Sequence, residues 1–193
     1  MRMKKKIALI LAAVVLVWAI AEVLNIKNEP PFGTESADTP EEYLKVNSYV
    51  EKSLKDDFAK TLPKSIPTNL AEKSYCYRYS CGVQEIASFY INLKLKYKSE
   101  ADFTAEYDRL QSADPKRTMH DGKAVHLFYG DDREALEGYF DNESYDGTVW
   151  RFNIVTVNSD ELTVEYTVAG IPDGAERFDA LTQRLLQMKA LLE

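Results

Sequence analysis

The chain has 193 residues and a net charge of −7, and 45% of its residues are apolar. This length is sufficient for one ordinary domain, and two cysteines are too few for a disulfide-rich scaffold. The acidic surplus argues against nucleic acid as a partner, because phosphate backbones bind positively charged surfaces.

The N-terminus joins a basic cluster to a long apolar segment. Arg2 and Lys4–Lys6 precede fifteen consecutive apolar residues, Ile7–Ala21. The segment Ile7–Leu24 contains eleven Ile, Leu or Val residues, whose transfer into a bilayer is worth about −5 kcal/mol in total. As a helix it would be about 27 Å long, close to the thickness of the hydrocarbon core. We therefore predict membrane contact through residues 7–24.

Residues 1–24 are predicted to be an N-terminal transmembrane or signal helix, either a retained signal anchor or a signal peptide cleaved after Ala21. Val17 and Trp18 favour the anchor, because the residues before a cleavage site are usually more polar. In both cases the basic cluster keeps the N-terminus in the cytoplasm. We thus expect a single-pass protein of the cell membrane with its C-terminal domain outside, or a secreted protein if the segment is cleaved.

The remainder of the chain has two parts. Residues 25–38 contain Pro30 and Pro31 without apolar periodicity, which predicts a flexible linker. Residues 1–21 hold four of the 24 basic residues and none of the 31 acidic ones, so the exported part carries a net charge of −11. We predict one extracytoplasmic α+β domain over residues 39–193.

Capping residues and apolar spacing predict the helices of this domain. Thr39-Pro40 followed by Glu42 opens a helix, Ser99 and Asp102 resemble a capping box, and Asp173 caps a terminal helix. The apolar residues after each of these starts recur at steps of three and four. The predicted helices cover residues 39–60, 99–111 and 173–193.

A period of two predicts the strands. Tyr75, Tyr77 and Tyr79 alternate with Cys76 and Arg78, and further strands are expected near residues 89–97, 125–129, 150–154 and 162–168. The strand over 89–97 alternates apolar with polar residues, which is typical of an antiparallel sheet covered on one side. We therefore predict an α+β fold with an antiparallel sheet of about five strands and helices packed on one face. The order also hints at a repeated strand-strand-helix unit, although a simple two-layer arrangement fits equally well.

Cys76 and Cys81 have four residues between them, on either side of a predicted hairpin turn. In an exported protein such a pair can form a disulfide if its Cα atoms come within about 7 Å. We expect a disulfide that fixes the turn and has no redox role, because the spacing is not Cys-x-x-Cys.

No cofactor or metal site is predicted. His120 and His126 lack a third ligand at a zinc-site spacing, and His126 is expected on an exposed polar strand face. Residues 131–146 are rich in Asp and Glu but do not match a calcium loop, because Tyr145 occupies a ligand position. We interpret this segment as a solvated acidic loop.

The sequence contains twelve tyrosines, an unusually high number. Aromatic rows on a strand can bind sugar rings or protein partners, but they can also pack beneath a helix. Both interpretations remain open for these tyrosines. The candidate binding surface comprises Tyr75, Tyr77, Arg78, Tyr79 and Tyr90.

These features favour a membrane-tethered, extracytoplasmic, non-catalytic binding domain of the cell envelope. Its partner would be an unknown envelope protein or glycan, and nucleic acid is not expected. The alternative is an envelope hydrolase of glycan or peptide that uses carboxylates of residues 131–146 as acid and base. A third hypothesis is a small ligand or lipid bound between the sheet and its helices.

Overall fold

The computed structural model describes residues 14–18, 33–36, 43–44, 61–80, 88–130, 140, 149–172 and 179–192. The chain divides into two units, Met1–Pro31 and Phe32–Glu193. In the first unit, residues 14–18 are helical and exposed, and the rest of the predicted membrane helix lies outside the described residues. Within the described residues, no helix has the length and apolar character needed to cross a membrane.

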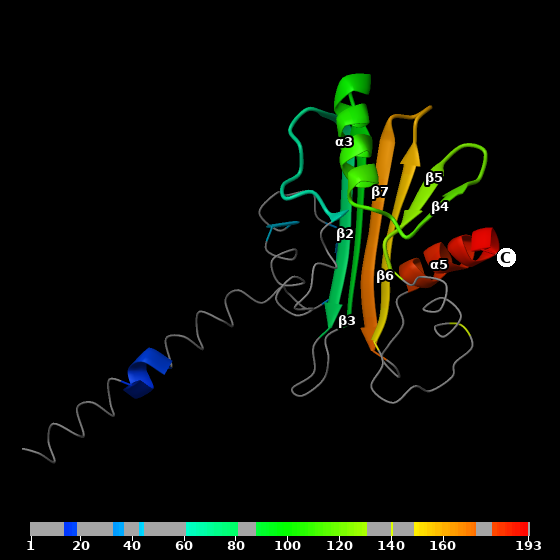
Figure 1. The fold of residues 1–193 in the computed structure, drawn as a ribbon. Coiled ribbons are helices and arrows are strands. Elements are labelled where there is room, and N and C mark those ends of the chain that lie inside the picture. Colours follow the sequence, from blue (N-terminus) through cyan, green and yellow to red (C-terminus); the bar gives the residue numbers. More distant parts are fainter. Residues whose placement is uncertain are drawn as a thin grey trace, which may run out of the picture. The chain divides into compact units, whose positions relative to one another are not determined.

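An antiparallel sheet forms the centre of the second unit (Figure 1). Its strand order is β1-β2-β3-β7-β6-β5-β4, so the hairpins β2–β3 and β6–β7 lie side by side in the middle. The strands are β1 (Gly33–Ser36), β2 (Leu70–Ser80), β3 (Ser88–Tyr97), β4 (Arg117–His120), β5 (Val125–Phe128), β6 (Val149–Asn158) and β7 (Thr163–Pro172). The predicted α+β class and antiparallel sheet are confirmed.

Two helices of the described residues pack against the sheet. Helix α3 (Glu100–Ser112) begins at the predicted cap, where the Ser99 hydroxyl accepts a hydrogen bond from the Asp102 amide at 3.2 Å. Helix α5 (Asp179–Leu192) is the terminal helix expected from the three-four apolar spacing. Of the first predicted helix, only residues 43–44 are described, and both are helical.

The two helices cover opposite faces of the sheet, so the prediction that helices pack on one face was wrong. On the first face, Leu93 and Tyr166 share a core with Phe103 and Leu110 of α3. On the second face, Phe152 and other apolar residues share a core with α5. The reason lies in hairpin β6–β7, which carries apolar residues at both alternating sets of positions. A two-sided apolar hairpin buries both of its sides.

The sheet also has two strands more than the five predicted. Strand β1 pairs with Cys76–Tyr79 of β2 and lies in the range predicted to be a linker. Strand β4 forms a hairpin with β5 through a turn in which Gly122 has a φ of 85°. The Asp121-Gly122 pair is a dipeptide that hairpin turns favour, so the sequence contained the signal for β4.

Gly170 in β7 lies directly opposite Phe89 in β3, and this close approach leads to a prediction. A Cβ atom at Gly170 would lie 2.4 Å from Cε1 of the Phe89 ring. Since Phe89 is buried, we expect Gly170→Ala to lower the free energy of unfolding by about 1 to 3 kcal/mol. Urea unfolding measures the effect. Gly170→Ala should cost less stability when it is added to Phe89→Leu than when it is added to the parent chain. A Gly170→Ala chain as stable as the parent would contradict the prediction.

Candidate functional site

One part of the second face is left open by α5. There, β2, β3 and β7 present a group of hydrophilic residues that we call the polar patch: Glu72, Ser74, Asn92, Lys94, Lys96 and Thr163. The Lys96 ammonium lies 3.6 Å from the Glu72 carboxylate, and 42% of the Lys96 side chain is exposed. Lys94 is exposed and forms no ion pair with any residue that the structure describes.

A shallow hollow of about 180 Å³ lies at one end of the polar patch. It is lined by Glu72, Lys73, Ser74, Lys94, Lys96, Glu161 and Thr163. Side chains of both charges and two hydroxyls line it, so it can form hydrogen bonds and ion pairs with a partner. An exposed ion pair such as Lys96–Glu72 is worth less than about 1 kcal/mol, so a partner could displace it at little cost.

A chain of polar contacts marks the border between the polar patch and α5. Asn92 donates to Glu165 at 2.8 Å, and the Arg184 guanidinium lies 3.5 Å from the other Glu165 oxygen. Arg184 also donates to the Thr156 hydroxyl at 2.6 Å. These contacts join α5 to β6 and β7, and they end the apolar core of the second face.

His126 continues this chain and is buried, so its predicted exposure was wrong. Its ring nitrogens lie 3.0 Å from the Thr156 hydroxyl and 3.1 Å from the Asp121 carboxylate, and only 2% of the residue is exposed. The amides of Ala124 and Lys123, together with His126, hold the pKa of Asp121 well below its usual range. Because that shift favours the charged carboxylate in the folded state, its contribution to stability would be lost as the pH falls below about 4.

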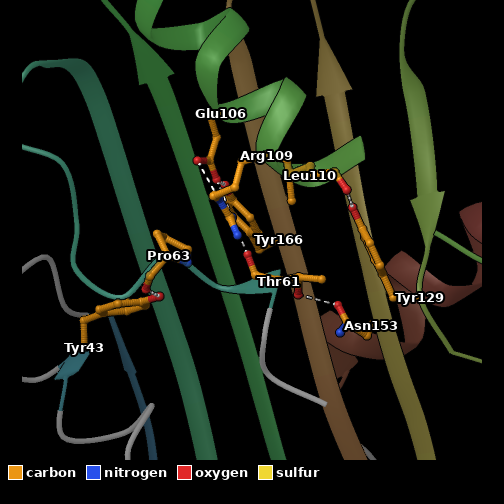
Figure 2. Close-up of polar contacts among 9 residues, drawn as sticks. All are labelled: Tyr43, Thr61, Pro63, Glu106, Arg109, Leu110, Tyr129, Asn153 and Tyr166. Atoms are coloured by element: carbon orange, nitrogen blue, oxygen red, sulfur yellow. Dashed lines mark hydrogen bonds and ion pairs between the residues drawn. The ribbon is translucent and has the colours of Figure 1, made fainter. Parts of the chain in front are cut away.

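A second polar cluster lies beneath α3 on the first face (Figure 2). Arg109 donates to both oxygens of Glu106, at 2.9 Å from Nε and 2.6 Å from a terminal nitrogen. The same guanidinium donates to the Thr61 carbonyl at 2.7 Å, and Tyr166 donates to Glu106. The Thr61 hydroxyl donates to Asn153 at 2.7 Å. The cluster therefore fixes α3 and residue 61 to strands β6 and β7.

The tyrosines around this cluster are held in their neutral form. Burial is the main cause that raises the pKa of Tyr97, Tyr129 and Tyr166, and the negative charge of Glu106 adds to it. Tyr129 donates to the Leu110 carbonyl at 2.8 Å. Glu106 is held by Arg109 and Tyr166, so the cluster joins α3 to β7.

A groove of about 430 Å³ opens beside this cluster, between α3 and the segment that leads into β2. It is lined by Pro67, Thr68, Asn69, Tyr97, Asp102, Ala105 and Glu106. Asn69 donates to Asp102 at 2.9 Å and connects the two walls. None of these residues was predicted from the sequence as part of a site, because the groove joins segments about 30 positions apart.

The candidate binding surface lies largely in the core. Tyr75, Tyr77 and Tyr90 are 2%, 1% and 6% exposed, and the side chains of Arg78 and Tyr79 lie outside the described residues. The Tyr75 ring stacks on Tyr77 with centroids 5.6 Å apart and meets Tyr43 edge-on at 5.3 Å. Tyr75 and Tyr77 therefore pack in the core, which was the other interpretation of the tyrosine row.

Cys76 lies within β2, where it pairs with Ser36 of β1 and Asn92 of β3. Cys76 is half-buried, and burial raises the pKa of its thiol. Cys81 lies outside the described residues, and no disulfide joins two residues within the described part. The expected turn between the cysteines is absent, because β2 continues to Ser80. The Cys76–Cys81 disulfide therefore stays a prediction, because Cys81 is outside the described residues.

The remaining sequence candidates give no site in the described residues. His120 lies on edge strand β4 and is exposed. Of the acidic segment 131–146 only Phe140 is described, so the carboxylates of the hydrolase alternative lie outside the described residues. Within the described part of the chain, no three His, Cys, Asp or Glu side chains are grouped closely enough to hold a metal ion.

Comparison with known proteins gives no family for this chain. No family model, no curated protein and no solved structure matches it.

Proposed function

We propose that this chain is a membrane-tethered, extracytoplasmic binding domain of the cell envelope that acts without catalysis. The polar patch would be its contact surface, and the partner would be an envelope protein or glycan. The apolar segment and basic cluster at the N-terminus support the tether and the orientation.

The observation that carries this proposal is the difference between the two ends of the second face. Near Tyr90 the strands are covered by α5, whereas at Ser74 and Lys94 the same strands are exposed. The exposed end offers the Lys94 ammonium, the Ser74 hydroxyl and the weak Lys96–Glu72 ion pair, which a partner could engage. The Glu106 carboxylate beneath α3 is bound by Arg109 and Tyr166, which favours binding over catalysis.

The polar patch can be tested in the full-length chain, expressed in the membrane of its own cell. A photo-crosslinking residue at Ser74 should give a discrete adduct, and Lys94→Glu with Lys96→Glu should abolish it. Lys123→Glu reverses one lysine charge at an exposed turn on another strand pair, so it should leave the adduct unchanged. An adduct that survives the double reversal, or no adduct at Ser74, would count against the polar patch.

The orientation needs its own measurement. A reporter fused after Glu193 should be active outside the cytoplasm and silent within it. The opposite result would overturn the envelope location and leave only the binding surface to be tested.

A further inference from the structure

The polar patch carries two lysines on its central strand. Lys94 and Lys96 are two positions apart in β3, on the part of the second face that α5 leaves open, so their Cα atoms are about 7 Å apart. Lys98 follows just beyond the end of β3 and is exposed. Positive charge therefore recurs at every second position along this part of the chain.

Lys94 has no carboxylate of its own. Glu165 lies opposite it in β7, but the Glu165 oxygens are engaged by Asn92 at 2.8 Å and by Arg184 at 3.5 Å. Lys94 forms no ion pair with any other residue in the described part of the chain. Its ammonium is thus available to an anion from outside the fold.

Lys96 is held only weakly. Glu72 lies opposite it in β2, and the 3.6 Å ion pair between the two side chains is exposed to solvent. Ser74 lies beside Lys94 and Thr163 lies beside Lys96, and both hydroxyl residues line the hollow. A carboxylate that lies between an ammonium and a hydroxyl can accept hydrogen bonds from both.

The charge of the whole chain limits the size of the anion that fits. Residues 22–193 hold 20 basic and 31 acidic residues, a net charge of −11. A long polyanion would extend beyond the lysines and meet that acidic surplus, and Glu161, which also lines the hollow, would add to the repulsion. Charges more than about 8 Å away are largely screened at physiological ionic strength, so a short acidic segment responds mainly to the lysines.

We infer, on the basis of the function proposed above, that the polar patch binds an extended acidic segment of a partner protein. Side chains on one side of an extended segment recur every two residues, about 7 Å apart, which matches the spacing of Lys94 and Lys96. One carboxylate pairs with Lys94 beside Ser74, and the next pairs with Lys96 in place of Glu72. The recognised pattern is an acidic residue at every second position.

The test uses the full-length chain in uncharged detergent micelles, with labelled threonine methyl groups. A capped Gly-Glu-Gly-Glu-Gly peptide should shift the Thr163 methyl resonance with a Kd of about 1 to 10 mM, because exposed ion pairs contribute little each. The methyl group of Thr104, exposed on α3, should not shift. Capped Gly-Glu-Glu-Gly-Gly should bind at least about twofold more weakly, and the peptide with Gln in place of Glu should give no shift.

Variants assign the charges. Lys94→Gln should weaken peptide binding about two- to fivefold, whereas Glu72→Gln should tighten it about two- to threefold because Lys96 is released. Lys123→Gln removes one positive charge at the exposed turn between β4 and β5, and Asp108→Asn removes one negative charge on α3. Both control variants should leave the Kd unchanged. Circular dichroism checks that each variant is folded.

Several results would overturn the acidic segment as the partner: no shift with the alternating peptide, equal shifts with the Gln peptide, equal affinity for adjacent Glu residues, or weaker binding in Glu72→Gln. Tighter binding of a uronic acid polymer, per carboxylate, would assign the surface to an anionic glycan instead. The crosslink at Ser74 is a separate result. An adduct without peptide binding would remove only the acidic partner, whereas peptide binding without an adduct would remove only the contact in the cell.

Discussion

Arg109→Met is expected to lower the free energy of unfolding by about 2 to 3 kcal/mol. Removing one partner of a fully buried ion pair costs about 3 to 5 kcal/mol, because the other charge is left without compensation. Here the Glu106 side chain is 14% exposed and the Arg109 side chain is 39% exposed, so solvent reduces the loss. The variant also removes the hydrogen bond to the Thr61 carbonyl. Urea unfolding at neutral pH measures the change.

A double-mutant cycle separates the ion pair from the packing of the arginine stem. Arg109→Met combined with Glu106→Gln should be more stable than Arg109→Met alone, because no uncompensated carboxylate remains. Arg117→Met makes the same substitution on exposed strand β4 and should change stability by less than about 0.5 kcal/mol. Equal losses at Arg109 and Arg117 would show that the cluster beneath α3 does not hold the fold together.

The central elements of this fold could be predicted because their sequences carry local signals. The alternation of β3 and the cap at Ser99 depend only on neighbouring residues, and both match the structure within one or two positions. The strands of hairpin β6–β7 were likewise marked by apolar alternation near residues 150–154 and 162–168. Local periodicity therefore identified the central strands, but it did not give their arrangement in the sheet.

The use of both faces could not be predicted from β3 alone. On the second face of the sheet, β3 carries Lys94 and Lys96 at one end and Tyr90 at the other. Only the register of β3 against β7 shows that α5 covers the end with Tyr90. The strand-strand-helix order does occur twice, at residues 70–112 and 149–192. The two helices nevertheless lie on opposite faces, so the units are not equivalent in the sheet.

The sites could not be predicted for a related reason. Glu106 and Arg109 are an ordinary surface pair in the sequence, and they become a buried cluster only because Tyr166 and Thr61 lie beneath α3. Asp102 and Tyr97 belong to a groove only because Asn69 lies opposite them. Each of these contacts depends on tertiary packing, which no spacing rule in a single sequence contains.

Buried tyrosines should make the domain unfold at alkaline pH. Burial, together with negative charge from Cys76 and Glu165, raises the pKa of Tyr90 to about 12, and burial likewise raises the pKa of Tyr97, Tyr129 and Tyr166. In the unfolded chain these phenols ionise near pH 10. The folded state thus holds its protons more tightly, so stability is complete below about pH 10 and falls as the pH rises toward 12.

The expected size of this effect is large for a domain of ordinary stability. A shift of two pKa units corresponds to about 2 to 3 kcal/mol, so Tyr90 alone would remove a substantial part of a typical 5 to 15 kcal/mol by pH 12. Tyrosinate absorbance and circular dichroism, followed together from pH 8 to pH 12, measure it. We expect part of the tyrosinate signal to appear only as the sheet unfolds. In Tyr90→Phe the decline of stability with pH should be shallower. Complete ionisation near pH 10 with the sheet intact would contradict the burial of these phenols, because a charged phenolate cannot stay in an apolar core without a compensating partner.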